Sequence, residues 1–288
     1  MSTPTGPEAW PGDRAARWVA VADRLEGQLA PVTDLLFAAA ELAPGESVLD
    51  VGCGTGPTTR QAARLVGPAG SVTGVDISPE MLDAARRRTT ADGASAPIEW
   101  VEHDVVAWDA GEARFDVVIS RFGVMFFADP HAAFVRLARA TVGDGRLRAA
   151  VWAHRPHIPL FDLPLTIALQ ELRRAGVTVD APPPDDGPYS LGDAAHVEHV
   201  LAGAGWSDVG WQPHEMRFRV GGGAGPVDAA TTSLEFGPAR IVLEGVDERV
   251  RRSAADALAA AFEQHLEDGE VVLGGRLAII SARRPSTA

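Results

Sequence analysis

The sequence of 288 residues has no lysine, one cysteine and no hydrophobic run long enough to cross a membrane. With Cys53 alone, a disulfide within the chain is excluded. The absence of lysine excludes a phosphate-binding loop of the Gly-Lys-Ser/Thr type. No charged-then-apolar leader pattern opens the chain, so we expect a cytoplasmic protein with no membrane partner.

Basic residues are also scarce. The chain has 26 Lys and Arg against 39 Asp and Glu, which gives a formal net charge of −13, and no run of five basic residues occurs. Proteins that bind nucleic acid need a cationic face for the phosphates, so nucleic acid is disfavoured as a substrate. The sequence also shows no cluster of metal ligands, and we expect no metal.

What is present is an alternation of strands and helices. Hydrophobic residues make up 46% of the chain and charged residues 23%, as in a globular protein with a core. The order strand, helix, strand predicts an α/β fold with a doubly wound parallel sheet. The expected strands cover residues 47–51, 71–75, 97–101, 115–120 and 146–152, with two more at 206–220 and 277–283.

The most informative stretch is residues 47–59, Ser-Val-Leu-Asp-Val-Gly-Cys-Gly-Thr-Gly-Pro-Thr-Thr. It predicts a buried strand, a glycine loop and a helix that begins at Pro57. Such glycines let the backbone approach a ligand, and the helix start offers free N–H groups to a nucleotide-like molecule. The dinucleotide motif Gly-x-Gly-x-x-Gly would need glycine where Pro57 stands, so another nucleotide-like ligand is expected.

The strand at 71–75 leads into Asp76. A carboxylate at this point can accept two hydrogen bonds from the hydroxyls of a ribose. Asp76 is 26 residues after Asp50, an ordinary distance for one strand–helix–strand repeat.

The string Val-Leu-Asp-Val-Gly-Cys-Gly-Thr-Gly, with Asp76 and the segment Ser-Arg-Phe-Gly-Val-Met-Phe-Phe-Ala-Asp-Pro at 120–130, resembles the class I S-adenosylmethionine-dependent methyltransferases. The likeness is strongest to the ubiquinone/menaquinone-biosynthesis type and its small-molecule relatives. It covers residues 47–152 well, and 13–46 and 190–210 loosely. It implies a Rossmann-like seven-stranded sheet whose last strand is antiparallel, and S-adenosyl-L-methionine as cofactor.

The resemblance also implies a set of site residues. It places at the cofactor Trp18, Asp50, Gly52, Cys53, Gly54, Gly56, Thr58, Asp76, Ile77, Met81, His103, Asp104, Val105, Ser120, Arg121 and Phe122. The expected acceptor-binding residues are Phe122, Met125 and Phe126, together with Phe161 and Tyr189 from the segment that follows the fifth strand.

Four regions follow from these patterns. Residues 1–42 should form a loose tail, which ends at residue 12, and two cap helices that are separated at Pro31. Residues 43–153 should form the cofactor-binding core. The proline-rich segment 154–190 cannot join the sheet, so we expect a lid inserted over the substrate. Residues 191–288 should complete the core, with a helical insertion at 221–270.

Methyl transfer requires alignment of a nucleophile behind the methyl carbon and, for a weak nucleophile, removal of a proton. His154 and His157, just after the fifth strand, are the candidate bases. The leading hypothesis is C-, N- or O-methylation of a small, largely apolar or aromatic acceptor in specialised-metabolite biosynthesis, by a monomer or homodimer.

Three alternatives stay open. The first is methylation of a quinone precursor in primary metabolism. The second is a cofactor-binding protein without transferase activity, which predicts a pocket blocked by residues 154–190. The third is a cyclase that uses the cofactor's charge, which would form product without releasing demethylated cofactor.

Overall fold

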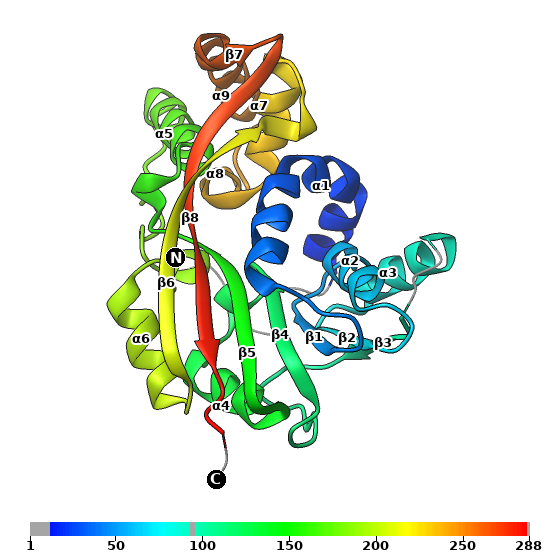
Figure 1. The fold of residues 1–288 in the computed structure, drawn as a ribbon. Coiled ribbons are helices and arrows are strands. Elements are labelled where there is room, and N and C mark those ends of the chain that lie inside the picture. Colours follow the sequence, from blue (N-terminus) through cyan, green and yellow to red (C-terminus); the bar gives the residue numbers. More distant parts are fainter. Residues whose placement is uncertain (1–11, 93–95, 287–288) are drawn as a thin grey trace.

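The protein is built on one sheet with the strand order β3-β2-β1-β4-β5-β8-β6 (Figure 1). A computed structural model describes residues 12–92 and 96–286, so the tail expected at 1–12 lies, except for Gly12, outside the described residues. Strands β1 to β5 run parallel, and β8 is antiparallel to both β5 and β6. The mostly parallel, doubly wound sheet with an antiparallel last strand is confirmed. Its strands are β1 (Ser47–Val51), β2 (Ser71–Asp76), β3 (Ile98–Glu102), β4 (Phe115–Arg121), β5 (Thr141–Trp152), β6 (Ser207–Arg219) and β8 (Glu270–Arg283), and β7 (Leu266–Glu267) pairs with β8.

Helices cover both faces of the sheet because neighbouring strand residues point to opposite sides. On β1, Val48 belongs to a core shared with Phe37 and Ala62, whereas Leu49 belongs to a second core shared with Phe134. The covering helices are α1 (Asp13–Ala40), α2 (Pro57–Val66), α3 (Pro79–Asp92), α4 (Pro130–Ala140) and α6 (Ala194–Gly203).

The N-terminal cap is one helix of 28 residues, and the separation expected at Pro31 is wrong. A proline inside a helix removes one backbone hydrogen bond, so tertiary contacts must compensate. Two guanidinium groups from β5 bind the last carbonyls of α1: Arg146 Nε donates to Ala40 O at 2.9 Å and Arg148 Nε to Ala39 O at 3.0 Å. These donors satisfy carbonyls that a helix end leaves without partners.

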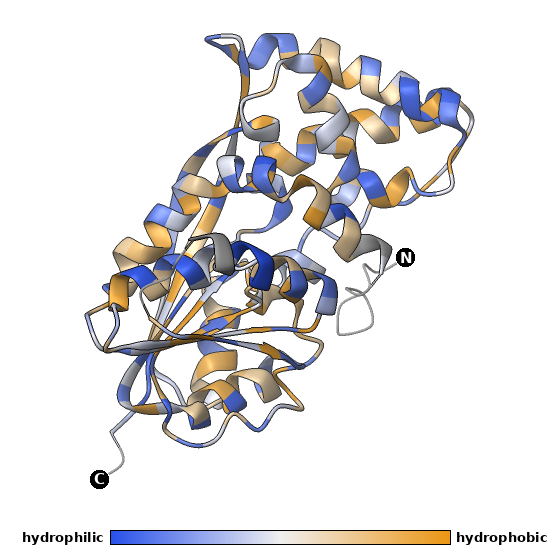
Figure 2. Ribbon diagram, turned by 90° about the vertical axis from the view of Figure 1, so that its right-hand side faces the viewer, coloured by the Kyte–Doolittle hydropathy of each residue, from blue (hydrophilic) through white to orange (hydrophobic). Residues whose placement is uncertain are grey.

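Two segments interrupt the alternation of strand and helix, and their helices pack together at one end of the molecule (Figures 1 and 2). The helix of the first segment, α5, contacts α8 and α9 of the second. Hydrophilic and hydrophobic residues alternate along these helices, which is typical of helices with one buried side (Figure 2). The elements are η3 (Arg155–His157), α5 (Pro159–Arg174), η4 (Gly187–Tyr189), η5 (Val220–Gly222), α7 (Pro226–Glu235), α8 (Gly237–Val242), α9 (Glu248–Phe262) and η6 (Glu263–His265). The four-region division stays a prediction.

Two strand boundaries differ from those expected. Strand β5 begins at Thr141, five residues before the expected start, because a register shift between Phe115 and Val117 of β4 admits extra residues into the strand. Strand β8 begins at Glu270, seven residues before the expected start, because it continues past β5 to pair with the far end of β6. Among the described residues, no helix is long and apolar enough to span a bilayer.

The carboxyl ends of β1 and β4 meet at two glycines. A Cβ on Gly52 would lie 2.6 Å from the Cα of Gly123, and a Cβ on Gly123 would lie 2.4 Å from the carbonyl oxygen of Val51. Neither glycine has room for a side chain at this point. The contact fixes where the glycine loop and the segment after β4 leave the sheet.

We expect Gly123→Ala to lower the free energy of unfolding by more than about 2 kcal/mol, because the new methyl group would force two backbones apart. The matched control is Gly225→Ala, since both glycines have φ −69° and a Cβ on Gly225 would meet nothing within 4 Å. The control should change stability by less than about 1 kcal/mol. Denaturant unfolding of both variants checks this, and an unchanged midpoint for Gly123→Ala would contradict the tight contact.

Candidate functional site

A cavity lies at the carboxyl ends of β1, β2 and β4, and α1 forms one side of it. Ligands of open parallel sheets bind at this edge, where the strand order reverses between β1 and β4. Most of the residues expected at the site line this cavity. They are Trp18, Gly52, Cys53, Gly54, Thr58, Asp76, Ile77, Met81, His103, Asp104, Val105, Arg121, Phe122 and Phe126.

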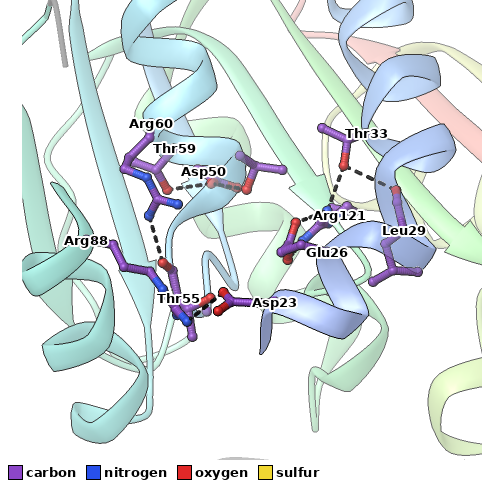
Figure 3. Close-up of polar contacts among 12 residues, drawn as sticks. Asp23, Glu26, Leu29, Thr33, Asp50, Thr55, Thr59, Arg60, Arg88 and Arg121 are labelled. Carbon is purple, nitrogen blue, oxygen red and sulfur yellow. Dashed lines mark hydrogen bonds and ion pairs between the residues drawn. The ribbon is translucent and has the colours of Figure 1, made fainter. Parts of the chain in front are cut away.

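Three residues expected at the cofactor lie behind the cavity wall. Asp50 accepts hydrogen bonds from the hydroxyls of Thr58 and Thr59, each at 2.6 Å, and ties α2 to β1 (Figure 3). Gly56 leaves room for the ring of Trp100, because a Cβ on Gly56 would lie only 2.4 Å from that ring. Burial raises the pKa of Asp50, and its Oδ1 has no hydrogen-bond partner among the described residues.

Ser120 is the third of these residues, and it is fully buried. Its hydroxyl donates to the carbonyl of Val51 at 2.8 Å. The same oxygen accepts the N–H groups of Gly123 at 3.1 Å and Val124 at 3.2 Å. Ser120 therefore holds the turn after β4 against the end of β1.

Five other candidate residues do not line the cavity. Phe161 and Tyr189 belong to an aromatic cluster behind it, with 6.3 Å between their ring centroids. Met125 is buried, and its sulfur accepts the backbone N–H of Trp152 at 3.2 Å. The candidate bases His154 and His157 lie at η3, after β5, and neither reaches the cavity lining.

Asp76 connects the second strand to the glycine loop. Its Oδ2 accepts the N–H of Gly54 at 2.8 Å, and its Oδ1 accepts the N–H of Ser78 at 2.9 Å. Burial raises the pKa of this carboxyl group, while the two backbone donors act against that shift. The side chain borders the cavity with lone pairs still available to a ligand.

The far side of the cavity contains an ion pair that the sequence did not reveal. Arg121 donates through both terminal nitrogens to Glu26 of α1, at 2.9 and 2.5 Å, and also to the hydroxyl of Thr33 at 2.6 Å (Figure 3). The Arg121 side chain is 9% exposed and that of Glu26 is 32% exposed. Bidentate geometry makes this a strong, orienting contact, and it fixes α1 over the cavity.

Glu26 was not among the expected site residues, because it stands among apolar residues of α1 whose spacing indicates only a helix with one buried face. Ala22, Leu25 and Leu29 have the three- and four-residue spacing of a buried helix face, and the structure places all three at the cavity wall. The one available signal was the carboxylate of Glu26 within that apolar face. The other unexpected lining residues are Val51, Thr55, Pro57, Val75, Gly123, Phe127 and Ala128.

Comparison with known proteins identifies the fold and its family. Residues 48–145 match the family model described as methyltransferase domain. A curated relative, nocamycin O-methyltransferase of Saccharothrix syringae, is 27% identical over 271 residues, which are 89% of this chain and 92% of the relative. The ubiquinone/menaquinone biosynthesis C-methyltransferase of Ectopseudomonas mendocina is 35% identical over 104 residues, 36% of this chain and 41% of the relative.

Residues 48–145 are therefore a methyltransferase domain, similar to the domains of the class I S-adenosylmethionine-dependent enzymes. The chain spans about half the length of other curated relatives: an uncharacterized Mycobacterium tuberculosis protein is 33% identical over 153 residues, 48% of this chain and 54% of the relative. Among solved structures, the [4+2]-cyclase SpnF shares the fold with a TM-score of 0.55 and 17% identity, covering 100% of this chain and 98% of SpnF.

The residues around the cavity fit the family's cofactor, S-adenosylmethionine. Gly54 lines the cavity, and a Cβ there would meet nothing within 4 Å, so the glycine leaves open space beside the loop. The carboxylate of Asp76 borders the same space, which suits a ligand with a pair of hydroxyl groups. The unpartnered oxygen of Asp50 lies just behind the loop and can take a further donor.

We expect Glu26→Gln to lower the free energy of unfolding by about 1–3 kcal/mol, because it leaves the guanidinium of Arg121 largely buried without its counter-charge. The matched control is Glu112→Gln. Glu112 pairs with Arg139, and both of those side chains are more than half exposed. The control should change stability by less than about 0.5 kcal/mol. Equal effects in denaturant unfolding would contradict a structural role for the buried pair.

The affinity for demethylated cofactor should fall as the pH is lowered. Only the ionised Asp76 accepts two hydroxyl donors. Because burial raises its pKa, lowering the pH should protonate the carboxylate, and weaken binding, at a pH above the usual aspartate pKa of about 3.9. Calorimetric titrations from pH 8 down to about pH 4, at roughly half-unit steps, measure this on wild type and Asp76→Asn. Glu26, His103 and Asp104 remain in both proteins, so a pH dependence that persists in Asp76→Asn would contradict the assignment.

Proposed function

We propose that this protein transfers the methyl group of S-adenosylmethionine to a small, largely apolar or aromatic acceptor, as an enzyme of specialised-metabolite biosynthesis. The observation that carries the proposal is one cavity with two kinds of lining. The polar half of the lining contains the glycine loop and Asp76. The apolar half contains side chains of α1 and of the segment after β4.

In this proposal the polar half holds the cofactor. Asp76 accepts the two ribose hydroxyls, and Gly52 and Gly54 let the loop backbone approach the methionine portion. Asp104 and Val105, after β3, border the end of the cavity where the adenine would bind. Asp104 is oriented for this by its own turn, in which its Oδ1 accepts the N–H of Val106 at 3.0 Å. The cofactor supplies an activated methyl group, and these residues hold it in place.

The apolar half receives the acceptor. Leu25 and Leu29 of α1 line this space together with Phe126 and Phe127, and apolar walls exclude water from the reacting atoms. Glu26, which stands between the two leucines in the sequence, is engaged with Arg121. Alignment of this kind supplies on the order of 7–11 kcal/mol of the barrier lowering. The site therefore suits an acceptor that needs little help in losing its proton, such as an acidic hydroxyl or an electron-rich carbon.

Two observations favour a transferase over the alternatives. No described residue of 154–190 lines the cavity, so that segment does not block it as a binding protein without activity would require. The relative that spans nearly the whole chain is named as an O-methyltransferase of nocamycin. The quinone-type relative matches 36% of the chain.

The test is release of demethylated cofactor from S-adenosylmethionine in the presence of a panel of phenols, enols and carboxylic acids. Wild type should turn over at least one acceptor, and Asp76→Ala should lose at least about 100-fold in kcat/KM because it loses two charge-assisted hydrogen bonds. Asp83→Ala, an exposed aspartate on α3, should keep the wild-type rate. Conversion of an acceptor without any demethylated cofactor would favour a cyclase. Failure of the wild type to bind the cofactor would contradict the proposal.

A further inference from the structure

Phe122 has a backbone conformation that bulky residues rarely adopt. Its φ is 68°, in the left-handed region that favours glycine. Of the described non-glycine residues with positive φ, Phe122 is the one aromatic; the others are Glu41, Ala113, Asp144, Asp208 and Asp268. Strained residues of this kind persist where the surrounding structure holds them, and they concentrate at ligand sites.

The surroundings hold Phe122 from both sides. Its N–H donates to the carbonyl of Ala150 on β5 at 3.0 Å. On the other side, the N–H of Gly123 bonds to Ser120 Oγ, and Gly123 packs directly against Gly52. The chain therefore cannot relax at Phe122 without breaking the contact between β1 and β4.

This conformation fixes the ring of Phe122 as well. The ring stacks on Trp152 with 4.4 Å between centroids and 10° between planes. Trp152 is packed in turn against Phe161 and Phe218, at 5.1 and 5.4 Å. One face of the Phe122 ring is thus covered by a rigid aromatic cluster, while the side chain borders the cavity.

The position of this ring along the cavity is also informative. Asp76 is bonded to the glycine loop through Gly54, and the same loop touches the turn of Phe122 through Gly52 and Gly123. Arg121 precedes Phe122 and faces α1. A ligand that extends from the carboxylate of Asp76 towards Arg121 therefore passes the ring of Phe122.

We propose that the open face of Phe122 receives the sulfonium of S-adenosylmethionine and makes the site prefer the charged cofactor to its neutral demethylated product. The inference rests on the proposed function. The sulfonium joins the ribose to the amino-acid chain, so it lies between the ribose that Asp76 would bind and the methionine portion beside the glycine loop, which touches the turn of Phe122. Aromatic faces attract such cations because the ring quadrupole is negative there.

The two carboxylates at this part of the cavity have other partners in the proposed function, so the ring is the group that meets the sulfonium. Glu26 forms its two bonds to Arg121, and Asp76 accepts the ribose hydroxyls. During transfer the acceptor's electron pair forms the new bond to the methyl carbon, and the electron pair of the broken C–S bond stays on sulfur. The positive charge moves to the acceptor, which releases a proton to water. The thioether that remains is neutral and loses the attraction between the positive charge and the ring, so product release is favoured.

The experiment is calorimetric titration of wild type, Phe122→Leu and Phe122→Gly with three ligands: S-adenosylmethionine, its demethylated product and the analogue that carries a protonated amine in place of the sulfonium. Leucine keeps apolar volume without a π face, and glycine removes the ring while accepting the positive φ. Both variants should bind the two cations about 3- to 30-fold more weakly, whereas the affinity for the neutral product should change less than about 2-fold. Binding of the product also shows that each variant is folded.

The matched control is Phe126→Leu, another aromatic residue of the cavity wall whose backbone has no positive φ. It should leave the ratio of the two affinities within about 2-fold of wild type. Equal weakening of charged and neutral ligands by the Phe122 variants, or an unchanged ratio, would overturn the assignment and leave the proposed function intact. A wild type that binds neither cofactor nor product would instead overturn the proposed function, and this inference with it.

Discussion

The close approach of Gly52 and Gly123 is the constraint on which the site depends. A side chain on either residue would meet backbone of the other segment at well under 3 Å. The contact turns the glycine loop towards Asp76 and turns the chain after β4 towards α1. It also holds Phe122 in its strained conformation. The positions of the glycine loop, Asp76 and Phe122 thus all depend on two backbones that pack without side chains between them.

Helix α1 is the second organising element, because it links the core to the inserted helices (Figure 1). Towards the core it forms the ion pair with Arg121. Towards the insertion, Gln28 accepts the N–H of Gly221 at 2.9 Å, and the ring of Trp18 meets that of Phe236 edge-on at 5.2 Å. The helix also supplies much of the apolar wall of the cavity. The inserted helices therefore contact the cavity wall through α1, and no described residue after Ala128 lines the cavity itself.

The sequence was most informative where function depends on local backbone chemistry. The glycine loop and Asp76 are short motifs at strand ends, and the parallel order of strands brings them together without further information. Glu26 and Leu25 could not be found in this way. Their role depends on how α1 docks, because the sequence pattern of an apolar helix face is the same whether the helix covers a sheet or a cavity.

The segment 154–190 shows the same limit. Its prolines correctly exclude it from the sheet, yet they do not say against what it packs. In the structure, Arg155 donates to the carbonyl of Pro182 at 2.6 Å, which binds the proline-rich stretch to the start of α5. Phe161 and Tyr189 then support Trp152 from behind, and His154 and His157 stay away from the cavity lining. Phe161 and Tyr189 thus support the cavity wall indirectly, through Trp152 and Phe122.

The most direct test of the central claim is a crystal structure with demethylated cofactor bound. The account predicts both ribose hydroxyls within hydrogen-bond distance of the carboxylate of Asp76, and the sulfur beside the ring of Phe122 under α1. Demethylated cofactor bound outside this cavity, or within it but without contact to Asp76, would contradict the account.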